Sequence, residues 1–440
     1  MALTGTHTPG DSGATTDDNL RDLAILSIAP RWAPATSYTL NQQVISPAGD
    51  VVKANTAHTS AGAYATDVAK WVLSTTFGTT AVVNVKDYGA KGDGTTDDTA
   101  AIQAAITATG WPTNRAKVIF PAGDYQVTGS ISINGGGATS TPHLVLEGHG
   151  ARLKTATASN TIIAVTNSVI SLTRIHFVGL FFLVNAAGAI GVSLNNAELC
   201  TFQRCGFLGS FATGIKITGT STYNTVTNCE FGSLSRGIEI AGGCDYLSVD
   251  VCHFNEQLAG TPLNWIGQTV ATAQSGIKIT GNTFYGTGAT LPVVYLTNAS
   301  TCQISDNAFD RCPLGGIFFG TGGSADANLI SANTFIRTGN ADDIKINGGN
   351  RCVVSANVFG VRQSVTAGTY SNIRIADPFS TAQGSGNAVT GNTSASTAAE
   401  LHSMIRFDAG CLNNAITGNV GRAIIVAAGA GTALTGNITA

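Results

Sequence analysis

The stretch LISANTFIR at residues 329–337 decides the fold, because the chain repeats its pattern many times. Neighbouring copies read KITGNTFYG at 278–286, QISDNAFDR at 303–311 and VVSANVFGV at 353–361. In each copy apolar and hydroxyl residues lead to an Asn, and a Phe follows two positions later. The Asn, or a Cys in its place, recurs at ten positions: Cys205, Cys229, Cys252, Asn282, Asn307, Asn333, Asn357, Asn392, Asn419 and Asn437. Self-similarity at a period of about 20 to 50 residues is typical of a solenoid.

The local pattern within each repeat favours strands over helices. Short alternating segments read GIKI at 214–217, GIEI at 237–240, DIKI at 343–346 and NIRI at 372–375. Gly and Asn punctuate these segments, and no helical periodicity separates them. We therefore predict an all-β fold, a parallel β-helix with two or three short strands in each coil.

The cysteines fit the same architecture. Six of the nine lie in the repeated column or in a second column five residues earlier: Cys200, Cys205, Cys229, Cys252, Cys302 and Cys352. A small apolar thiol or an Asn amide suits a column that stacks from coil to coil. We expect reduced core residues rather than disulfides. Because no CxxC or Cys/His cluster has ligand spacing, we expect neither a metal nor a cofactor.

Composition and termini exclude several classes of protein. Only 11% of the 440 residues are charged and the net charge is -3, whereas nucleic-acid binding requires clustered Lys and Arg. No apolar run approaches the roughly 18 residues of a membrane span. The start, MALTGTHTPGDSG, lacks the basic and apolar regions of a secretory signal. We expect no nucleic-acid partner, no membrane insertion and no signal peptide.

The entry to the repeats carries a recognisable signature. Residues 83–106 read VNVKDYGAKGDGTTDDTAAIQAAI, and VIFPAGDYQV follows at 118–127. Thr95, Thr96 and Asp97 are N-cap candidates for a helix over 100–106, which would cover the open end of the coils. This region resembles the opening of the pectate-lyase-like superfamily, especially bacteriophage tailspikes and related depolymerases. The resemblance implies a right-handed β-helix with a capping helix, in which Asp93, Asp97 and Asp98 are structural.

Two further motifs resemble parts of polygalacturonase active sites. Gly148-His149-Gly150 is similar to their histidine turn, and Asn340-Ala341-Asp342-Asp343 is similar to their paired aspartates. In that family the aspartates precede the histidine, whereas here the order is reversed. A polygalacturonase is therefore not the favoured prediction.

The N-terminal part of the chain lacks the repeat and is predicted to form separate segments. Residues 30–77 resemble small chitin-binding-type carbohydrate modules, with Trp32, Tyr38 and Trp71 among the matching positions. Aromatic faces stack on sugar rings, which makes Trp32 and Tyr38 candidate glycan contacts. The alternative is that the tryptophans form the core of so small a domain. Residues 1–29 would be a virion-attachment segment by resemblance, and residues 78–440 the β-helix.

Candidate chemistry follows from the stacking of coils. Glycoside hydrolysis uses two carboxylates, about 6.5 to 9.5 Å apart in inverting enzymes. Glu256 and Asp310 follow the Phe column two coils apart, which predicts a separation of about 9 to 10 Å. Tyr285 lies on the coil between them, and Trp265 lies in a long insert that we expect to cover the site. Glu256 is the predicted acid and Asp310 the predicted base.

A second set of candidates lies on neighbouring strands. Glu230 and Asp250 are alternative catalytic carboxylates, and His253 is expected beside Glu230 on the next coil. Arg311 and Arg337 are candidate sugar contacts. The alternative for all of them is a solvated exterior in which carboxylates pair with nearby arginines, as Asp310 would with Arg311.

The resemblance also implies a function. The favoured prediction is a phage tailspike, located in the virion tail, that binds and hydrolyses a bacterial surface polysaccharide. A homotrimer and a phage tail or baseplate protein, bound through the N-terminal segment, are the expected partners. The alternative is a receptor-binding or structural tail protein without catalytic activity.

Overall fold

The structure is a computed structural model that forms two compact units, Met1–Thr80 and Ala81–Ala440. It describes residues 31–40, 42–45, 51–73, 81–136, 143–209, 212–255, 263–270, 272–286, 290–320, 325–339, 341–361, 370–376, 385–395, 403–409, 411–421, 424–426 and 432–439. Among these residues no helix is both long enough and apolar enough to cross a bilayer.

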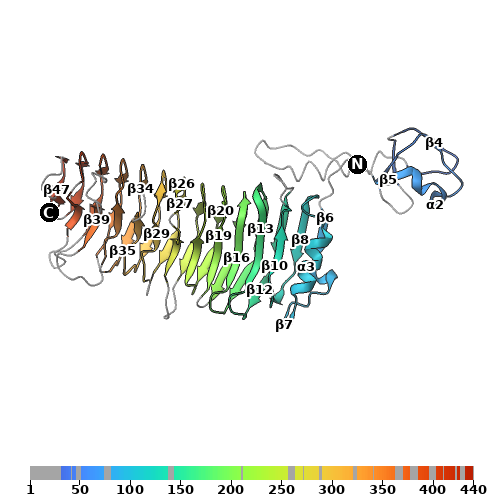
Figure 1. The fold of residues 1–440 in the computed structure, drawn as a ribbon, viewed down its shortest axis with the longest axis horizontal. Helices are drawn as coiled ribbons and strands as arrows, with labels where there is room; N and C mark the ends of the chain where they lie inside the picture. The colour runs from blue at the N-terminus through green and yellow to red at the C-terminus, as the bar shows by residue number, and fades with distance from the viewer. Residues whose placement is uncertain are drawn as a thin grey trace, which may run out of the picture. The chain divides into compact units, whose positions relative to one another are not determined.

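The second unit is a parallel β-helix built from three long sheets (Figure 1). Successive coils add one strand to each sheet, so neighbouring strands come from successive repeats. The prediction of a right-handed parallel β-helix is confirmed. Sheet I contains β10 (Ile131–Asn134), β13 (Thr161–Leu172), β16 (Ile190–Glu198), β19 (Thr213–Thr218), β22 (Arg236–Ile240), β25 (Asn264–Gln268), β29 (Val294–Leu296), β33 (Ile317–Phe319), β36 (Ile344–Asn347), β39 (Ser371–Ala376), β42 (Ser403–Phe407) and β45 (Ile424–Val426).

The other two sheets run beside it over the same coils. Sheet II contains β6 (Ala81–Asn84), β8 (Ala116–Phe120), β11 (Leu144–Gly148), β14 (Ile175–Val178), β17 (Thr201–Gln203), β20 (Thr225–Thr227), β23 (Ser248–Asp250), β27 (Lys278–Thr280), β31 (Gln303–Ser305), β34 (Leu329–Ser331), β37 (Val353–Ser355), β40 (Ala388–Thr390), β43 (Ala415–Thr417) and β46 (Ala433–Thr435). Sheet III contains β7 (Asp93–Asp97), β9 (Gly123–Gln126), β12 (Ala151–Thr155), β15 (Phe181–Val184), β18 (Gly206–Gly209), β21 (Glu230–Gly232), β24 (His253–Asn255), β28 (Thr283–Tyr285), β32 (Ala308–Asp310), β35 (Thr334–Ile336), β38 (Val358–Phe359), β41 (Thr393–Ser394), β44 (Val420–Gly421) and β47 (Ile438–Thr439).

Alternation along each strand separates the core from the surface. In β34, Ile330 is fully buried between Leu329 and Ser331, which are partly exposed. The parallel register keeps like residues together, because Ile330 pairs with Ile304 on one side and with Val354 on the other. Side chains of a strand alternate between its two faces. Each position of the repeat therefore becomes a column along the helix axis, either inside or outside.

The recurring Asn forms a continuous ladder inside the turn between sheets II and III. Asn333 Oδ1 accepts hydrogen bonds from the backbone N–H and the Nδ2 of Asn307, at 3.1 and 2.9 Å. Asn333 Nδ2 in turn donates to Asn357 Oδ1 and to the carbonyl of Ile304, both at 2.9 Å. The same bonds continue to Asn437 at the last described coil. A buried amide in every coil thus satisfies the backbone at a bend where strand pairing stops.

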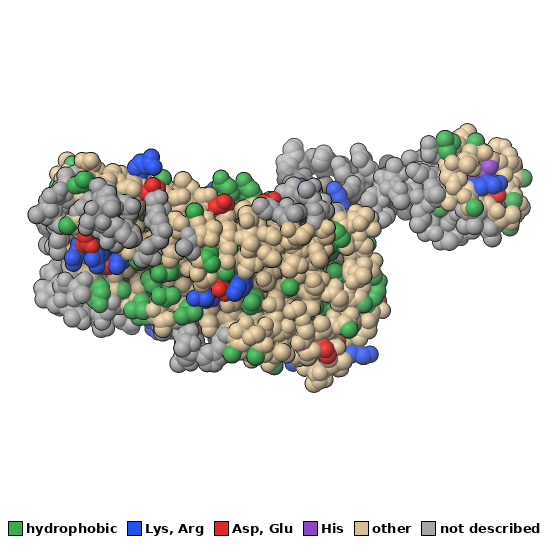
Figure 2. Space-filling model, in the orientation of Figure 1, with side chains coloured by type: hydrophobic (Ala, Val, Ile, Leu, Met, Phe, Trp, Pro, Cys, Tyr) green, Lys and Arg blue, Asp and Glu red, His purple; other side chains and the backbone are tan. Residues whose placement is uncertain are grey.

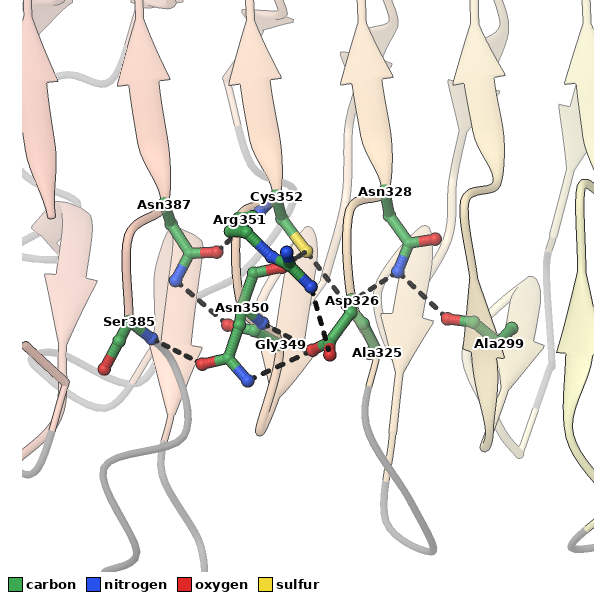
Figure 3. Close-up of polar contacts among 10 residues, drawn as sticks. All are labelled: Ala299, Ala325, Asp326, Asn328, Gly349, Asn350, Arg351, Cys352, Ser385 and Asn387. Carbon is green, nitrogen blue, oxygen red and sulfur yellow. Dashed lines mark hydrogen bonds and ion pairs between the residues drawn. The ribbon is translucent and has the colours of Figure 1, made fainter.

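A second ladder lies in the turn between sheets I and II (Figure 3). Asn328 Nδ2 donates to the carbonyls of Ala299 and Ala325, at 3.0 and 2.8 Å. On the outer side of this turn, Asn350 accepts a hydrogen bond from the backbone of Ser385 and donates to Asp326. Inner and outer amides therefore hold the same turn from both sides.

Phenylalanine rings stack beside the first ladder. Consecutive rings from Phe182 to Phe359 lie 4.7 to 5.0 Å apart, centroid to centroid. The stack consists of Phe182, Phe207, Phe231, Phe254, Phe284, Phe309, Phe335 and Phe359, all at most 1% exposed. Such offset stacking adds to the free energy gained by burying the rings.

Helix α3 (Thr99–Ala108) covers the first coils and packs against β6, β10 and η2 (Val85–Tyr88). Its buried face comprises Ile102, Ala105 and Ile106. The helix begins at Thr99 and its N-cap is Asp98, one residue after the last of the three candidates, Asp97. The Asp98 carboxylate accepts hydrogen bonds from the backbone N–H groups of Lys91 and Gly92. The acidic signature therefore stabilises the capping structure rather than forming a functional site.

The carboxylates of Asp93 and Asp97 also accept hydrogen bonds within the cap. Hydrogen bonds from Thr128 and Thr99 lower the pKa of Asp97 to about 2. Hydrogen bonds from Thr96 and Thr95, backbone N–H groups first, hold the pKa of Asp93 far below its usual value. Both therefore stay ionised and bonded within the cap.

The described part of the first unit is a small β structure. Its strands are β1 (Ser37–Tyr38), β2 (Gln43–Ile45), β3 (Val51–Ala54), β4 (His58–Thr59) and β5 (Trp71–Leu73), with α2 (Tyr64–Asp67) and η1 (Val68–Lys70). Tyr38 and Trp71 are 3% and 6% exposed and contact each other edge to face, at 4.9 Å. Trp32 is partly buried and packs against this core. The prediction that Tyr38 contacts glycan is therefore wrong, because its ring fills the core.

All nine cysteines are buried free thiols, as the repeat predicts. Burial raises the pKa of Cys200 and of Cys302 to about 12, so neither is a thiolate at neutral pH. We expect Cys205, Cys229 and Cys252 to resist alkylation by iodoacetamide in the native protein and to react once guanidinium chloride is added. Peptide mapping by mass spectrometry measures this, and rapid labelling of the three thiols without denaturant would contradict the ladder.

Candidate functional site

A groove lies on the outer face of sheet I. It has a volume of about 310 Å³ and is lined by side chains of β29, β33, β36 and β39 and by the turns that lead into them. Lining residues with functional side chains are Tyr295, Phe318, Asp342, Lys345, Tyr370 and Arg374. Charged side chains are sparse over the face of the molecule drawn in Figure 2, where they gather in small groups. A groove that combines aromatic, basic and acidic side chains is therefore a distinctive feature of this surface.

The register of sheet I places four of these side chains, those of Tyr295, Phe318, Lys345 and Arg374, in one outward column. Tyr295 pairs with Phe318, Phe318 with Lys345, Lys345 with Arg374, and Arg374 with Arg406. On either side of each, the strand buries an apolar residue, such as Ile344 and Ile346 around Lys345. The alternating pattern that fills the core thereby aims the intervening residues outward.

The column begins with an aromatic platform. The rings of Tyr295 and Phe318 are stacked with centroids 4.9 Å apart and planes 8° from parallel. Lys345 Nζ lies 5.9 Å from the Phe318 ring, within the range of a cation–π contact. On the preceding coil the column position is Gly267, which adds no side chain against Tyr295. Tyr295 is thus the outermost ring of the platform.

Ion pairs close the other end of the column. Arg374 lies between two carboxylates, with Nη2 2.7 Å from Asp408 Oδ2 and Nη1 3.7 Å from Asp342 Oδ2. Arg406 Nε lies 2.9 Å from Asp408 Oδ1, and the backbone N–H of Ser371 donates to Asp342 Oδ1 at 2.8 Å. Burial favours a lower pKa for Arg374, but its bonds to Asp408 outweigh burial and raise the pKa. Both carboxylates therefore face the permanent cation of Arg374.

Of the predicted catalytic pair, only Asp310 lies in the residues that the structure describes. Glu256 lies outside them. Asp310 forms a two-pronged ion pair with Arg337, whose Nε lies 2.9 Å from Asp310 Oδ1. The predicted partner Arg311 instead donates a hydrogen bond to the hydroxyl of Tyr285 and lies over its ring, at 5.1 Å. The contacts by Arg311, Arg337 and Tyr285 to a sugar stay predictions, as does the catalytic pair.

The prediction for Trp265 is wrong. Instead of covering a cleft from a loop, Trp265 lies in β25 and is fully buried. Its ring packs against Phe254, at 5.6 Å, and its Nε1 donates to the carbonyl of Tyr285 at 3.0 Å. Each coil needs a strand in sheet I, and the long insert supplies one there, which draws this ring into the core.

The second set of candidates is divided between two sheets. Glu230 and His253 are exposed register neighbours on β21 and β24 of sheet III, as expected. Asp250 lies in sheet II, where it accepts hydrogen bonds from Ser248 and Thr280. Their catalytic roles stay predictions. No three His, Cys, Asp or Glu side chains gather as a metal site would require in the part of the chain that the structure describes.

Sequence reasoning missed the groove although the signal was present. GIKI, GIEI, DIKI and NIRI mark the strands of sheet I, and their third residues form the outward column together with Tyr295 and Phe318. Aligning those third residues with Tyr295 and Phe318 gives a line of three basic, one acidic and two aromatic side chains. Asp342 was visible in the motif Asn340-Ala341-Asp342-Asp343 but was set aside with the polygalacturonase comparison.

The first coils of this fold are similar to a known protein family. A model of the family described as rhamnogalacturonase A/epimerase, pectate lyase-like, matches residues 82–179. The chain is 49% identical over 69 residues to mannuronan C5-epimerase AlgE2 of Azotobacter vinelandii. That match covers 15% of this chain and 7% of the epimerase, so this chain spans a small part of the length of that relative.

Solved structures share the fold along most of the chain. DFA-IIIase from Arthrobacter chlorophenolicus A6 has 14% identity and a TM-score of 0.58, over 78% of this chain and 94% of that one. The Dettilon tailspike protein has 17% identity and a TM-score of 0.53, over 82% of this chain and 68% of the tailspike. At such low identity these similarities establish the β-helix fold alone.

Proposed function

We propose that the groove on sheet I binds a polysaccharide chain, with one sugar ring stacked against Tyr295. The observation that carries this proposal is the aromatic platform of Tyr295 and Phe318 inside a groove lined by polar side chains. Sugar rings present apolar C–H faces and a rim of hydroxyls. They therefore fit a site with an aromatic surface and a few fixed hydrogen-bonding groups.

The comparisons support a carbohydrate ligand. The matching family model is named for rhamnogalacturonase and epimerase, and the relative AlgE2 is named for mannuronan. Side chains of four successive coils line the groove, so a polymer that runs along the helix axis would meet successive contacts about 4.8 Å apart.

We further propose that the protein is a homotrimeric phage tailspike that hydrolyses a bacterial surface polysaccharide. The resemblance of residues 83–106 to tailspike openings supports this role. Asp342 is the carboxylate of the groove, and the cation of Arg374 beside it suits a general base.

One observation favours the second candidate, a receptor-binding protein without catalysis. Hydrolysis requires a protonated acid as well as a base. Among the described residues, Asp342 is the single carboxylate that lines the groove. Release of oligosaccharides of defined size from purified bacterial polysaccharide decides between the two functions.

We expect Tyr295→Ala to weaken polysaccharide binding by about 10- to 30-fold, because truncating an aromatic anchor costs roughly 2 kcal/mol. Surface plasmon resonance on immobilised capsular polysaccharides measures the change. Tyr223→Ala is the matched control, since Tyr223 is 51% exposed and stacks on Tyr246 at 4.7 Å, yet does not line the groove. Equal affinities of Tyr295→Ala and the unmodified protein would remove the groove from the binding site.

A further inference from the structure

Two histidines share a hydrogen bond on the outer face of sheet II, away from the groove. His143 directly precedes β11, and His176 lies in β14 on the next coil. The Nδ1 atom of His143 lies 2.8 Å from the Nε2 atom of His176. The ring planes are within 5° of parallel, but 2.8 Å is shorter than the contact of about 3.5 Å between aromatic faces, so the rings meet edge to edge. One N–H group therefore lies between the two rings.

The second nitrogen of His176 is also bonded. Its Nδ1 lies 2.7 Å from Thr201 Oγ1, on the following coil in the register of sheet II. A hydroxyl group can donate or accept, so Thr201 fits either tautomer of His176. The remaining ring nitrogen is Nε2 of His143, whose side chain is exposed. A row of hydrogen bonds thus joins three successive coils.

The number of protons that this row can hold follows from its hydrogen bonds. In the neutral pair, one ring donates the shared N–H and the other accepts it. One added proton is accommodated on an outer nitrogen, either His143 Nε2 or His176 Nδ1, and leaves the shared bond in place. A second added proton makes both rings imidazolium ions, which have N–H donors at every nitrogen and no acceptor. The shared bond is then lost, and two like charges are left in contact.

The surroundings of the pair are basic. Arg115 and Arg174 directly precede β8 and β14, the two neighbours of β11 in sheet II. Burial lowers the pKa of His143, and the charges of Arg174 and Arg115 lower it further. Burial also lowers the pKa of His176, with a smaller effect from His143. Among the described residues no carboxylate contacts either ring, and residues 137–142, which precede His143, contain no titratable side chain.

The other titratable side chains of the adjoining coils are bonded elsewhere. Lys117 of β8 forms an ion pair with Glu147 of β11, and His149 Nε2 lies 3.3 Å from the same carboxylate. Glu198, at the end of β16, accepts a hydrogen bond from the hydroxyl of Thr222 at 2.6 Å. The charge balance at the pair is therefore set by the two histidines and the two arginines.

We propose that His143 and His176 form a pH-sensitive contact between the coils that follow the capping helix, closed while the pair carries at most one proton charge and opened when both rings are protonated. Because folding lowers the pKa of both histidines, the opened chain binds protons more readily than the closed one. The stabilisation is therefore complete above about pH 6.5, the ordinary pKa of histidine, and is lost as the pH falls below it. This property belongs to the scaffold and is independent of what the groove binds.

Amide hydrogen exchange of the full chain tests the contact. Deuterium uptake is followed by mass spectrometry in peptides that contain β11 and β14, at about pH 7.5 and about pH 4.5, on either side of the ordinary pKa. After correction for the intrinsic effect of pH on exchange, we expect opening to be at least about 10-fold more frequent at the lower pH. Each proton taken up on opening changes the equilibrium by up to about tenfold per pH unit. Peptides of β34 and β37, on coils without histidine, are the internal reference.

Two variants locate the response. His143→Gln removes one of the two charges and keeps a side chain that can bond to His176. We expect it to be protected like the unmodified protein at the higher pH and to open less than about 2-fold more at the lower pH. His149→Gln is the matched control, because it removes an exposed histidine next to β11 that is not bonded to the pair. This control is expected to keep the full acid response.

A second measurement requires no variant. Exchange of the imidazole C2–H with deuterium reports the pKa of each histidine separately. The proposal requires His143 and His176 to take up protons at lower pH in the native chain than in guanidinium chloride. Equal or higher values in the native chain overturn it, as does equal opening at the two pH values. An acid response that persists in His143→Gln, or that disappears in His149→Gln, also overturns it, because charges outside the pair then cause the response.

Discussion

Asn333→Leu is expected to lower the free energy of unfolding by about 3 to 6 kcal/mol, the largest effect of any single substitution considered. The leucine removes the acceptor of Asn307 and the donor to the Ile304 carbonyl, in a place where Asn333 is fully buried. Each buried group left without a partner costs about 1 to 3 kcal/mol. Denaturation in guanidinium chloride, followed by circular dichroism until the signal is constant, measures the loss.

The last rung of the ladder provides the control. Asn437 accepts the same bonds from Asn419 but is only partly buried. Water can replace part of what Asn437→Leu removes, so we expect a loss of less than about 2 kcal/mol. Equal losses at the two positions would mean that the ladder does not hold the coils together.

Asp342→Asn is expected to reduce polysaccharide cleavage by at least about 100-fold while binding stays within about 3-fold. The amide keeps the shape of the side chain and its acceptor for the N–H of Ser371, but it cannot take a proton as a base. Turnover is measured by the release of reducing ends, and affinity is measured separately on the same preparation.

Asp310→Asn distinguishes catalysis in the groove from catalysis by the pair of carboxylates predicted from the sequence. Asp310 is bonded to Arg337 and does not line the groove, so the groove hypothesis expects near-normal cleavage. The pair of Glu256 and Asp310 predicts the reverse result, with Asp310→Asn inactive and Asp342→Asn active. If the unmodified protein binds its polysaccharide without cutting it, the receptor-binding alternative is correct.

The interior was predictable because its columns repeat. Asn307, Asn333 and Asn357 share one environment, so the same physical demand for a buried amide recurs in each coil and shows in the sequence. The capping helix was predictable for a related reason, since its apolar face at Ile102, Ala105 and Ile106 follows helical spacing.

The candidate site in the groove was harder to predict from the sequence. Outward residues such as Tyr295, Lys345 and Arg374 differ from coil to coil, because solvent imposes no common requirement on them. Long inserts also hide the position of a strand, which is why Trp265 was expected on the surface and is found in the core. The register of the coils determines which outward residues become neighbours on each sheet. The repeat pattern in the sequence does not show this register by itself.

Because inward and outward residues alternate in sheet I, the outward residue of each coil can be substituted independently of the core. Ile344 and Ile346 maintain the interior on the coil where Lys345 lines the groove, so Lys345 can be replaced without disturbing either neighbour. A lineage could therefore exchange one contact of the groove at a time, or lengthen the groove by duplicating a coil, while the interior stays the same. Binding of new ligands in the groove would then evolve in single steps, each no larger than one residue or one repeat.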